Sequence, residues 1–349
     1  MSYKAGMAAL NLELTDMVPR TEYSVEAHWD LVKHVTGIDG RVEGNADKAK
    51  QALMKAWDFS FKWATFIHGE VLGGWHTSMG HAAYSADGGD KKNQIYCPFK
   101  DEDEVLAFDP LEKLGEVDIE ETVKRFNVHY QKNVDYLPDA VNMTGIYVTC
   151  MSGLIEMFGW DMLLTAAGVD PEGFGKITNR YCDWMKQYFI ALAKSDAPVV
   201  MLHDDIVWTS GAFLHPDWYR KYIFPNYKKM FAPLHEAGKK IMYTSDGNYT
   251  EFVDDIAACG VNCFVIEPTT DMAYIAEKHG KTHAFIGNAD TRVLLHGTKE
   301  DIYNEVKRCM DIGKKCPGFF MAVGNHIPAN TPIDSCLYYD EYYRKLGKR

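Results

Sequence analysis

The second half of the chain repeats one pattern, in which a short apolar run ends on a polar residue and a helical stretch follows. The apolar runs occupy residues 199–202, 240–243, 263–266, 284–286 and 319–323. Helical patterns separate them at about residues 216–236, 250–258, 271–279 and 299–312. Parallel strands need such crossovers, so this order favours an α/β barrel over a sandwich or a helix bundle. We predict a TIM (β/α)8 barrel, a fold whose strands all end at one catalytic mouth.

Three further strand candidates lie in the first half of the chain. They are Met17–Tyr23, Phe59–Ile67 and Asn142–Thr149. A length of 349 residues is ordinary for a barrel of eight strand and helix units with insertions. Because 46% of the residues are hydrophobic, the chain can bury a large core. We therefore predict a single barrel domain over residues 1–349, with an N-terminal extension.

Residues 69–117 interrupt the alternation with paired glycines, aromatic residues, histidines and an acidic stretch. We interpret this segment as a long inserted loop. Such loops are often lids or binding loops, and four of its side chains would suit a lid over a substrate. These are Trp75, His76, His81 and Tyr84. A surface excursion with a few packed aromatic side chains is the alternative.

The charge balance disfavours two classes of partner. The chain has 49 acidic and 37 basic residues, a formal net charge of −12, and its basic clusters are only Lys-Lys pairs. We therefore expect neither nucleic acid nor an anionic membrane surface as a partner. The eight cysteines form no Cys-x-x-Cys pair, and residues 1–14 lack the pattern of a secretion signal. We expect reduced thiols, no membrane anchor and a cytoplasmic location.

Two carboxylates at strand ends are the first candidates for chemistry. Asp246 precedes Gly247, which permits a sharp turn, but it could also cap the helix that begins near Thr250. Glu267 ends an apolar run before Pro268. If it is buried, it needs either a basic partner or a cation, since burying an unpaired charge is costly. The spacing leaves these alternatives open.

Further polar side chains follow three other strands. Asp204 and Asp205 point in different directions, so at most one of them enters the site, and a helix cap or a salt bridge is the alternative. Asn288 follows the next-to-last apolar run and His326 the last one. Asp, Glu and His are all competent Zn²⁺ ligands, and three protein ligands leave a catalytic position open. No His-Glu-x-x-His motif supports a zinc site here.

Five short segments share the pattern of a known superfamily. They are Asp204-Asp205, Pro216-Asp217-Trp218-Tyr219, Ser245-Asp246-Gly247-Asn248, Gly287-Asn288-Ala289-Asp290 and Leu294–Asp301. Together they resemble the uroporphyrinogen decarboxylase superfamily, which includes cobalamin-dependent methyltransferases. The resemblance is best over residues 196–335, and Val18–Tyr23 resembles the opening of the methyltransferase branch.

The branches of this superfamily differ in their signatures. The decarboxylase branch carries an N-terminal Arg-Gln-Ala-Gly-Arg signature that grips substrate carboxylates, and nothing equivalent surrounds Arg20. The thiol-methylating branch has a His-x-Cys zinc motif where this chain has Thr244-Ser245-Asp246. Oxygen donors in place of thiolates suit a more Lewis-acidic metal that acts on an ether or hydroxyl oxygen. The chain therefore most resembles the methyltransferase component of anaerobic O-demethylases.

This resemblance implies a reaction and a set of roles. Such enzymes take a methyl group from a methyl ether, often an aryl methyl ether, and pass it to the Co(I) of a separate corrinoid protein. We predict that Zn²⁺ assists the departure of the oxygen and is held by Asp246, Glu267 and His326. The candidate catalytic and substrate-positioning residues are Asp204, Tyr23, Asn288 and Tyr243.

Two other functions stay open at this point. One is methyl transfer from methylcobalamin to a thiol or another acceptor. The other is a non-catalytic barrel that binds a corrinoid or another tetrapyrrole, since a fold does not fix a function. Aromatic residues near the predicted mouth suit a flat apolar substrate, although they also fill the core of any large barrel. They include Trp75, Tyr147, Trp208 and Tyr243.

Overall fold

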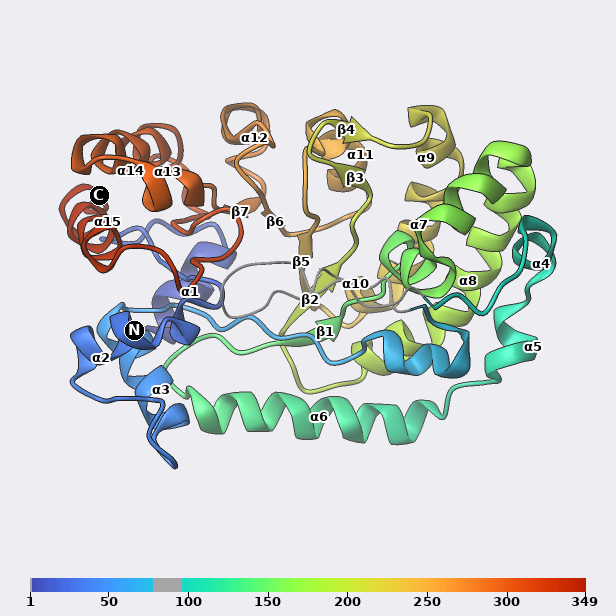
Figure 1. The fold of residues 1–349 in the computed structure, drawn as a ribbon, viewed down its shortest axis with the longest axis horizontal. Coiled ribbons are helices and arrows are strands. Elements are labelled where there is room, and N and C mark those ends of the chain that lie inside the picture. The colour runs from blue at the N-terminus through green and yellow to red at the C-terminus, as the bar shows by residue number, and fades with distance from the viewer. Residues whose placement is uncertain (1, 78–95) are drawn as a thin grey trace.

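The computed structural model describes residues 2–77 and 96–349, and a parallel sheet surrounded by helices lies at its centre (Figure 1). Six strands neighbour one another in the order β1-β2-β5-β6-β7-β8. Their bounds are β1 Thr144–Ile146, β2 Val199–His203, β5 Lys240–Thr244, β6 Cys263–Val265, β7 Ala284–Ile286 and β8 Phe319–Phe320. Every neighbouring pair is parallel, as the alternation of strands and helices in the sequence predicts.

Two extended segments from the first half of the chain close this sheet into a barrel. They are joined to it and to each other by isolated parallel bridges. These bridges are Arg20 with Phe59, Arg20 with Met321, Phe61 with Val141, and Ile67 with Ile146. Six strands and two segments fill the eight positions of a TIM barrel, and the predicted fold class is confirmed.

The two closing segments are bridges rather than the regular strands that the sequence predicts. In the first segment, Pro19 has no N–H to donate to a ladder. In the second, the step from Phe61 to Ile67 is one residue longer than the step between their partners, Val141 and Ile146. One extra residue on one side is a bulge, which interrupts the pairing.

Helices follow the strands and surround the sheet, and both termini lie on the same side of the molecule (Figure 1). The first half contains α1 Tyr3–Leu10, α2 Trp29–Thr36, α3 Ala46–Ala56, α4 Glu102–Ala107, α5 Pro110–Leu114, α6 Ile119–Tyr136, α7 Met151–Val169 and α8 Pro171–Ala193. The second half contains α9 Pro216–Tyr222, α10 Phe224–Glu236, α11 Val253–Ala257, α12 Met272–Lys278, α13 Thr291–His296, α14 Lys299–Gly313 and α15 Ile333–Leu346. The helix predicted at about 216–236 is two helices, since Pro225 favours a new helix start.

Shorter elements complete the chain. Three are 3-10 helices: η1 Val25–Ala27, η2 Gly69–Trp75 and η3 Thr250–Phe252. A small antiparallel hairpin, which the sequence did not reveal, follows β2 and consists of β3 Val207–Trp208 and β4 Gly211–Ala212.

Strand residues alternate between two buried cores, as the pleat of a sheet requires. Val199 and Met201 of β2 belong to the core inside the barrel, which also contains Leu10 of α1. Val200 and Leu202 belong to the core between the strands and the outer helices. This alternation decides which side chains beyond the strand ends can enter the barrel mouth.

Buried ion pairs connect the segment around Arg20 to α15. Arg20 is fully buried and forms ion pairs with Glu22, at 3.1 Å from Nε to Oε1, and with Asp340. Its guanidinium also lies 4.2 to 5.0 Å from the centroids of three aromatic rings. These rings belong to Trp57, Tyr339 and Tyr343. The segment is thus held by charge and by cation–π contacts at the point where the barrel closes.

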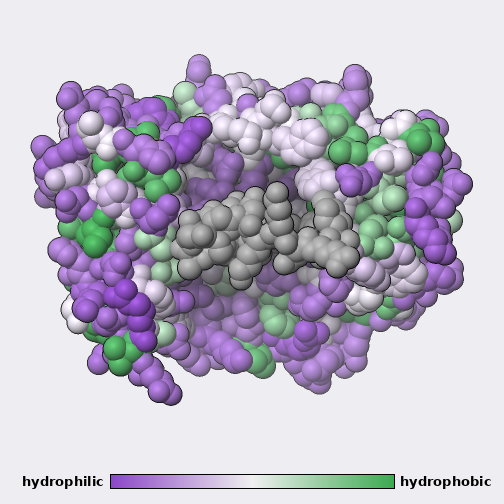
Figure 2. Space-filling view, viewed as in Figure 1, coloured by the Kyte–Doolittle hydropathy of each residue, from purple (hydrophilic) through white to green (hydrophobic). Residues whose placement is uncertain are grey.

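The inserted segment contains η2, α4 and α5. Trp75 packs against Phe99 and Phe108, with ring centroids 5.6 and 5.0 Å away, so this side chain belongs to a packed aromatic cluster. His81 and Tyr84, which we also proposed for a lid, lie outside the described residues. Hydrophilic residues cover much of the face shown in Figure 2, with smaller apolar groups among them. Within the described ranges, none of the helices is both long enough and apolar enough to cross a membrane.

Candidate active site

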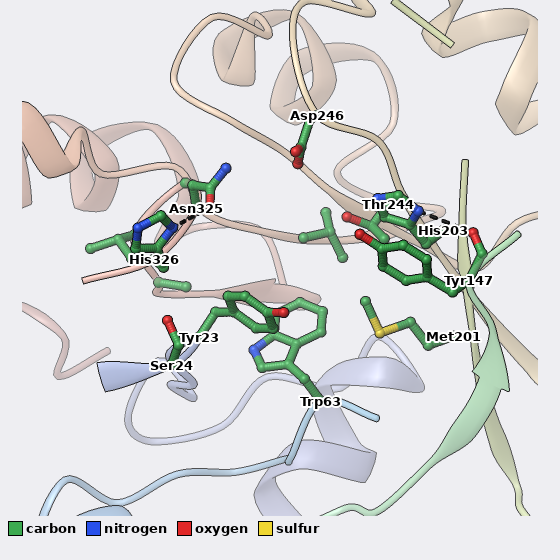
Figure 3. Close-up of a pocket in the computed structure, with 14 residues that line it drawn as sticks. Tyr23, Ser24, Trp63, Tyr147, Met201, His203, Thr244, Asp246, Asn325 and His326 are labelled. Atoms are coloured by element: carbon green, nitrogen blue, oxygen red, sulfur yellow. Dashed lines mark hydrogen bonds between the residues drawn. The ribbon is translucent and has the colours of Figure 1, made fainter. Parts of the chain in front are cut away.

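A cavity of about 510 Å³ opens at the carboxyl ends of the barrel strands (Figure 3). Its polar lining includes His203, Thr244, Asp246, Asn325 and His326. Its aromatic and apolar lining includes Tyr23, Trp63, Tyr147, Met201, Val265 and Val323. A volume of this size, with apolar walls and a few convergent polar groups, is typical of a small-molecule site.

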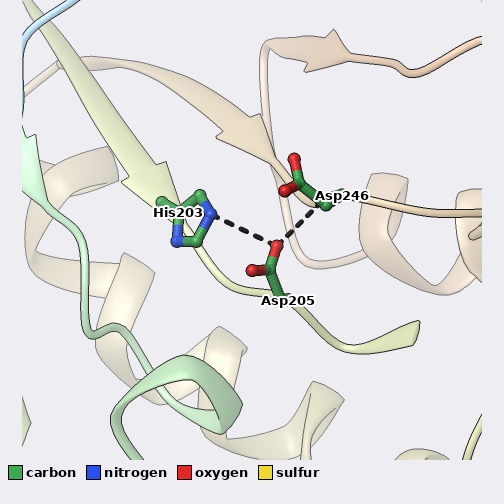
Figure 4. A group of neighbouring side chains, drawn as sticks. All are labelled: His203, Asp205 and Asp246. Atoms are coloured by element: carbon green, nitrogen blue, oxygen red, sulfur yellow. Dashed lines mark hydrogen bonds and ion pairs between the residues drawn. The ribbon is translucent and has the colours of Figure 1, made fainter. Parts of the chain in front are cut away.

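Three side chains form a tight cluster at one end of this cavity (Figure 4). His203 is the last residue of β2, Asp205 lies two residues beyond it, and Asp246 follows the neighbouring strand β5. One possible ligand atom of each residue lies within 4.8 Å of the other two. Nε2 of His203 is 3.2 Å from Oδ1 of Asp205, and that oxygen accepts a 2.8 Å hydrogen bond from the backbone N–H of Asp246.

The imidazole of His203 is also fixed on its far side. Its Nδ1 lies 3.1 Å from the backbone carbonyl oxygen of Tyr147, and its ring stacks on the Tyr147 ring with centroids 3.9 Å apart. A ring nitrogen that donates to a carbonyl directs the other nitrogen at the cluster. Histidines that bind metals in proteins are commonly held in this way.

The electrostatics of the cluster favour a cation at its centre. Burial alone lowers the pKa of His203, but the carboxylates of Asp205 and Asp246 outweigh burial and raise the pKa to about 9. Burial, together with the negative charges of Asp205 and Glu267, raises the pKa of Asp246 to about 7. The raised pKa favours the protonated imidazole, whose Nε2 lies 3.2 Å from Oδ1 of Asp205. A metal ion would compete for the same position.

The donor set fits Zn²⁺. One imidazole nitrogen and two carboxylate groups are ligands that zinc accepts, and three protein ligands leave a fourth position for water or a substrate. Within residues 2–77 and 96–349, this is the one group of three or more His, Cys, Asp and Glu residues whose ligand atoms come so close together. The cluster is therefore a candidate metal site.

The metal ligands predicted from the sequence are only partly brought together. Of Asp246, Glu267 and His326, only Asp246 belongs to the cluster. Glu267 accepts a 2.8 Å hydrogen bond from the N–H of Gly247 and another from the side chain of Asn325. His326 lines the opposite wall of the cavity (Figure 3), with Nδ1 2.8 Å from Oδ1 of Asn325. Glu267 thus supports the Asp246 turn through Gly247.

The turn at Gly247 has the sharp geometry that the sequence suggests. Its φ of 83° lies in the left-handed region, which favours glycine. A Cβ atom at this position would lie 2.6 Å from the carbonyl oxygen of Trp208 in the hairpin. Glycine therefore lets the hairpin approach closely while Asp246 reaches the cavity.

Asp204, predicted as a catalytic residue, lies outside the cavity lining and is fully buried. Its Oδ1 accepts hydrogen bonds from the N–H groups of Cys150, at 3.0 Å, and Ser152, at 2.7 Å. Its Oδ2 accepts one from the hydroxyl of Tyr227. Asp204 thus caps the N-terminus of α7, where a negative charge is favourable. This matches the cap that the sequence left open as an alternative.

We expect Asp204→Ala to lower the free energy of unfolding by about 3 kcal/mol, because it leaves the N–H groups of Cys150 and Ser152 without an acceptor and leaves the Tyr227 hydroxyl only the 3.3 Å contact with the Tyr243 hydroxyl. Asp204→Asn keeps one carbonyl acceptor and should cost clearly less. Urea denaturation measures both changes. Equal stability of the wild type and the alanine variant would show that the cap is dispensable.

The other predicted catalytic residues differ in position. Tyr23 lines the cavity and is 49% exposed. Tyr243 is fully buried in the outer core, where its hydroxyl donates to the carbonyl oxygen of Asp204 at 3.2 Å. Asn288 is also buried, and its amide donates to the carbonyl oxygens of Glu267 and Thr270, both at 3.1 Å. Tyr23 alone among these three faces the cavity.

Of the two residues that join Asp246 in the cluster, His203 was not selected from the sequence, and Asp205 was considered there only as the alternative to Asp204. The signal was the period of two along β2. Val199 and Met201 face the barrel interior, so His203 and then Asp205 continue on the inner side while Asp204 turns outward. Continuing the inward and outward alternation of β2 beyond its last residue would have favoured Asp205 over Asp204 as the residue that enters the site.

A comparison of the sequence with models of known protein families gives a match. The family model described as uroporphyrinogen decarboxylase (URO-D) matches residues 102–345. The chain belongs to the uroporphyrinogen decarboxylase family. The resemblance inferred from the strand-end segments is therefore confirmed.

The individual relatives have low sequence identity to the chain. Uroporphyrinogen decarboxylases of Carboxydothermus hydrogenoformans and Syntrophotalea carbinolica are 26% and 24% identical to the chain over 177 and 176 residues. These alignments cover 51% and 50% of the chain, and the chain spans about half the length of these curated relatives. A methyltransferase from Methanosarcina mazei has a similar structure, with a TM-score of 0.65 over 99% of both chains and 17% identity. That likeness supports the barrel fold.

Proposed function

We propose that this member of the uroporphyrinogen decarboxylase family is a methyltransferase. It moves a methyl group from a methyl ether, in particular an aryl methyl ether, to the Co(I) of a separate corrinoid protein. The observation that carries the proposal is the cluster of His203, Asp205 and Asp246, which faces a cavity with aromatic walls. A solved methyltransferase with the same fold over nearly the whole chain adds support.

The reaction makes one main demand on the site. The electron pair of Co(I) forms the new bond to the methyl carbon while the carbon–oxygen bond breaks. The pair of that bond stays on the oxygen, which then takes a proton from water to give an alcohol or a phenol. Because an alkoxide or phenoxide leaves poorly, groups that stabilise negative charge on the oxygen control the rate. Zn²⁺ held by His203, Asp205 and Asp246 would supply a Lewis acid for this oxygen.

The remaining walls suit a flat and weakly polar methyl donor. Tyr23, Trp63 and Tyr147 line the cavity with aromatic rings, and the Tyr23 and Trp63 rings meet edge to face at 6.4 Å. Met201 and Val265 add apolar surface. An aromatic ring buried among these side chains would exclude water from the reacting oxygen and hold the methyl group in place.

Two other reactions of the superfamily receive less support from the cavity. Among the lining residues that the structure describes there is no lysine or arginine, so a substrate with many carboxylates would lack cationic partners. Those lining residues also include no cysteine. Zinc ligation by thiolates, as in the thiol-methylating branch, would therefore need side chains from elsewhere.

The proposal is tested by mixing the zinc-loaded protein with a Co(I) corrinoid carrier protein and a panel of methoxylated aromatics. We expect the absorbance of Co(I) to give way to that of methyl-Co(III) with at least one donor, and one equivalent of demethylated product to form. His34→Ala, an exposed histidine on α2, serves as the matched control for His203→Ala. No spectral change with any ether would favour a barrel that binds without turnover.

A further inference from the structure

Tyr147 lies one residue beyond β1, and its ring stacks against two histidine rings. The His203 ring is parallel to it at a centroid distance of 3.9 Å, and the His68 ring lies 5.0 Å away at an interplanar angle of 24°. His68 is itself anchored, with Nε2 3.2 Å from the hydroxyl oxygen of Thr65. These contacts fix the plane of the tyrosine ring, so its hydroxyl has one well-defined direction.

That direction leads into the cavity. Tyr147 belongs to the cavity lining, and its hydroxyl end points to the interior on the side of Thr244 and Asp246 (Figure 3). The same residue also supports the cluster through its backbone, because its carbonyl oxygen is the partner of His203 Nδ1. Tyr147 therefore connects the candidate metal site to the space where a substrate would bind.

We propose that Tyr147 is a catalytic residue, whose hydroxyl donates a hydrogen bond to the ether oxygen as the carbon–oxygen bond breaks. This inference rests on the function proposed above. The tyrosine keeps its proton and forms no covalent bond, so the leaving oxygen still takes its proton from water. The hydrogen bond strengthens as negative charge develops on that oxygen, and it therefore favours the transition state over the bound ether.

Two features make this hydroxyl better suited than the other donors of the cavity. Its ring is already held by stacking, so no ordering is needed during the reaction. It also lines the same cavity as Asp246, whose carboxylate would repel a developing phenoxide unless a donor faces it. Asp205 is close as well, because its Oδ1 lies 3.2 Å from Nε2 of His203, the ring that stacks on Tyr147.

The test is the variant Tyr147→Phe, which keeps the ring and the backbone carbonyl and should retain zinc. We expect the turnover rate to fall about 100-fold, as for the loss of one preorganised donor to an oxyanion. The loss should be largest for ethers of weakly acidic phenols. It should be small for ethers of nitrophenols, because a nitrophenoxide is a good leaving group without a hydrogen-bond donor. A plot of log rate against leaving-phenol pKa is therefore expected to be steeper than for the wild type. Tyr3→Phe, at an exposed tyrosine on α1, is the control.

The outcomes separate this inference from the proposed function. If the wild type transfers methyl groups and Tyr147→Phe does so at the same rate with the same slope, the role of Tyr147 is overturned while the function stands. If the wild type is inert with every donor, both fall. If Tyr147→Phe loses zinc, a fluorinated tyrosine at position 147 decides instead. Its more acidic hydroxyl should flatten the slope, and an unchanged slope would refute the role.

Discussion

Substituting alanine for His203 is expected to strip zinc from the purified protein and to slow methyl transfer more than about 100-fold. Loss of an outer partner of a metal ligand already costs about 10–100-fold in affinity or activity, and His203 is the only nitrogen donor of the cluster. The substitution also removes the imidazole that lies 3.2 Å from Asp205 and whose charge offsets the repulsion between the carboxylates of Asp205 and Asp246. Elemental analysis of the purified variant measures the zinc, and the Co(I) assay measures the transfer.

Other substitutions decide which residues hold the metal. Asp246→Asn should lose zinc like His203→Ala, while Asp183→Asn, at an exposed position of α8, should not. Glu267→Gln and His326→Ala should retain zinc if the cluster holds it. Loss of zinc in those two variants, with full zinc in His203→Ala, would instead support the ligand set predicted from the sequence.

Arg20→Ala is expected to have the largest effect on stability, a loss of about 3–5 kcal/mol in the free energy of unfolding. Glu22 would remain fully buried with no cation beside it, although it still accepts hydrogen bonds from Tyr339 at 2.7 Å and from the N–H of Val323 at 3.0 Å. The substitution also removes three cation–π contacts at the closure of the barrel. Urea denaturation followed by tryptophan fluorescence measures the loss.

The control for this prediction is Arg41→Ala. Arg41 is also paired, with Asp30 and Asp39, but its side chain is exposed and solvent screens the pairs. We expect this variant to unfold almost as the wild type does. If Arg20→Ala and Arg41→Ala shift the transition equally little, the buried ion pair does not hold the barrel closed.

The sequence predicted the barrel well because its local signals agree with the fold. Each apolar run of the second half became a parallel strand, and the runs are separated by helices at the predicted places. The first half was harder, because closure there depends on single bridges made by Arg20, Phe61 and Ile67. Pro19 interrupts the first of the two closing segments and a bulge interrupts the second, so neither forms the regular strand that an alternating sequence pattern predicts. Long-range partners such as Asp340 for Arg20 cannot be read from local sequence.

The sequence predicted where the candidate site lies, but it did not predict all of the residues that form it. The strand ends do meet at one mouth, and Asp246, Tyr23 and His326 do line the cavity. Asp204, by contrast, is turned outward by the pleat and caps α7, whose bonded N–H groups lie 52 and 54 residues earlier in the chain. Glu267 and Asn288 are drawn into hydrogen bonds with loop backbone, and spacing along the chain could not reveal this.

X-ray absorption at the zinc edge of the purified protein tests the central claim most directly. If His203, Asp205 and Asp246 hold the metal, the spectrum should show a first shell of nitrogen and oxygen at about 2.0–2.2 Å, with the outer-shell scattering of a single imidazole. That imidazole signal should vanish in His203→Ala. A shell at about 2.3 Å, the distance of a zinc–sulfur bond, or an imidazole signal that survives in His203→Ala, would contradict the account.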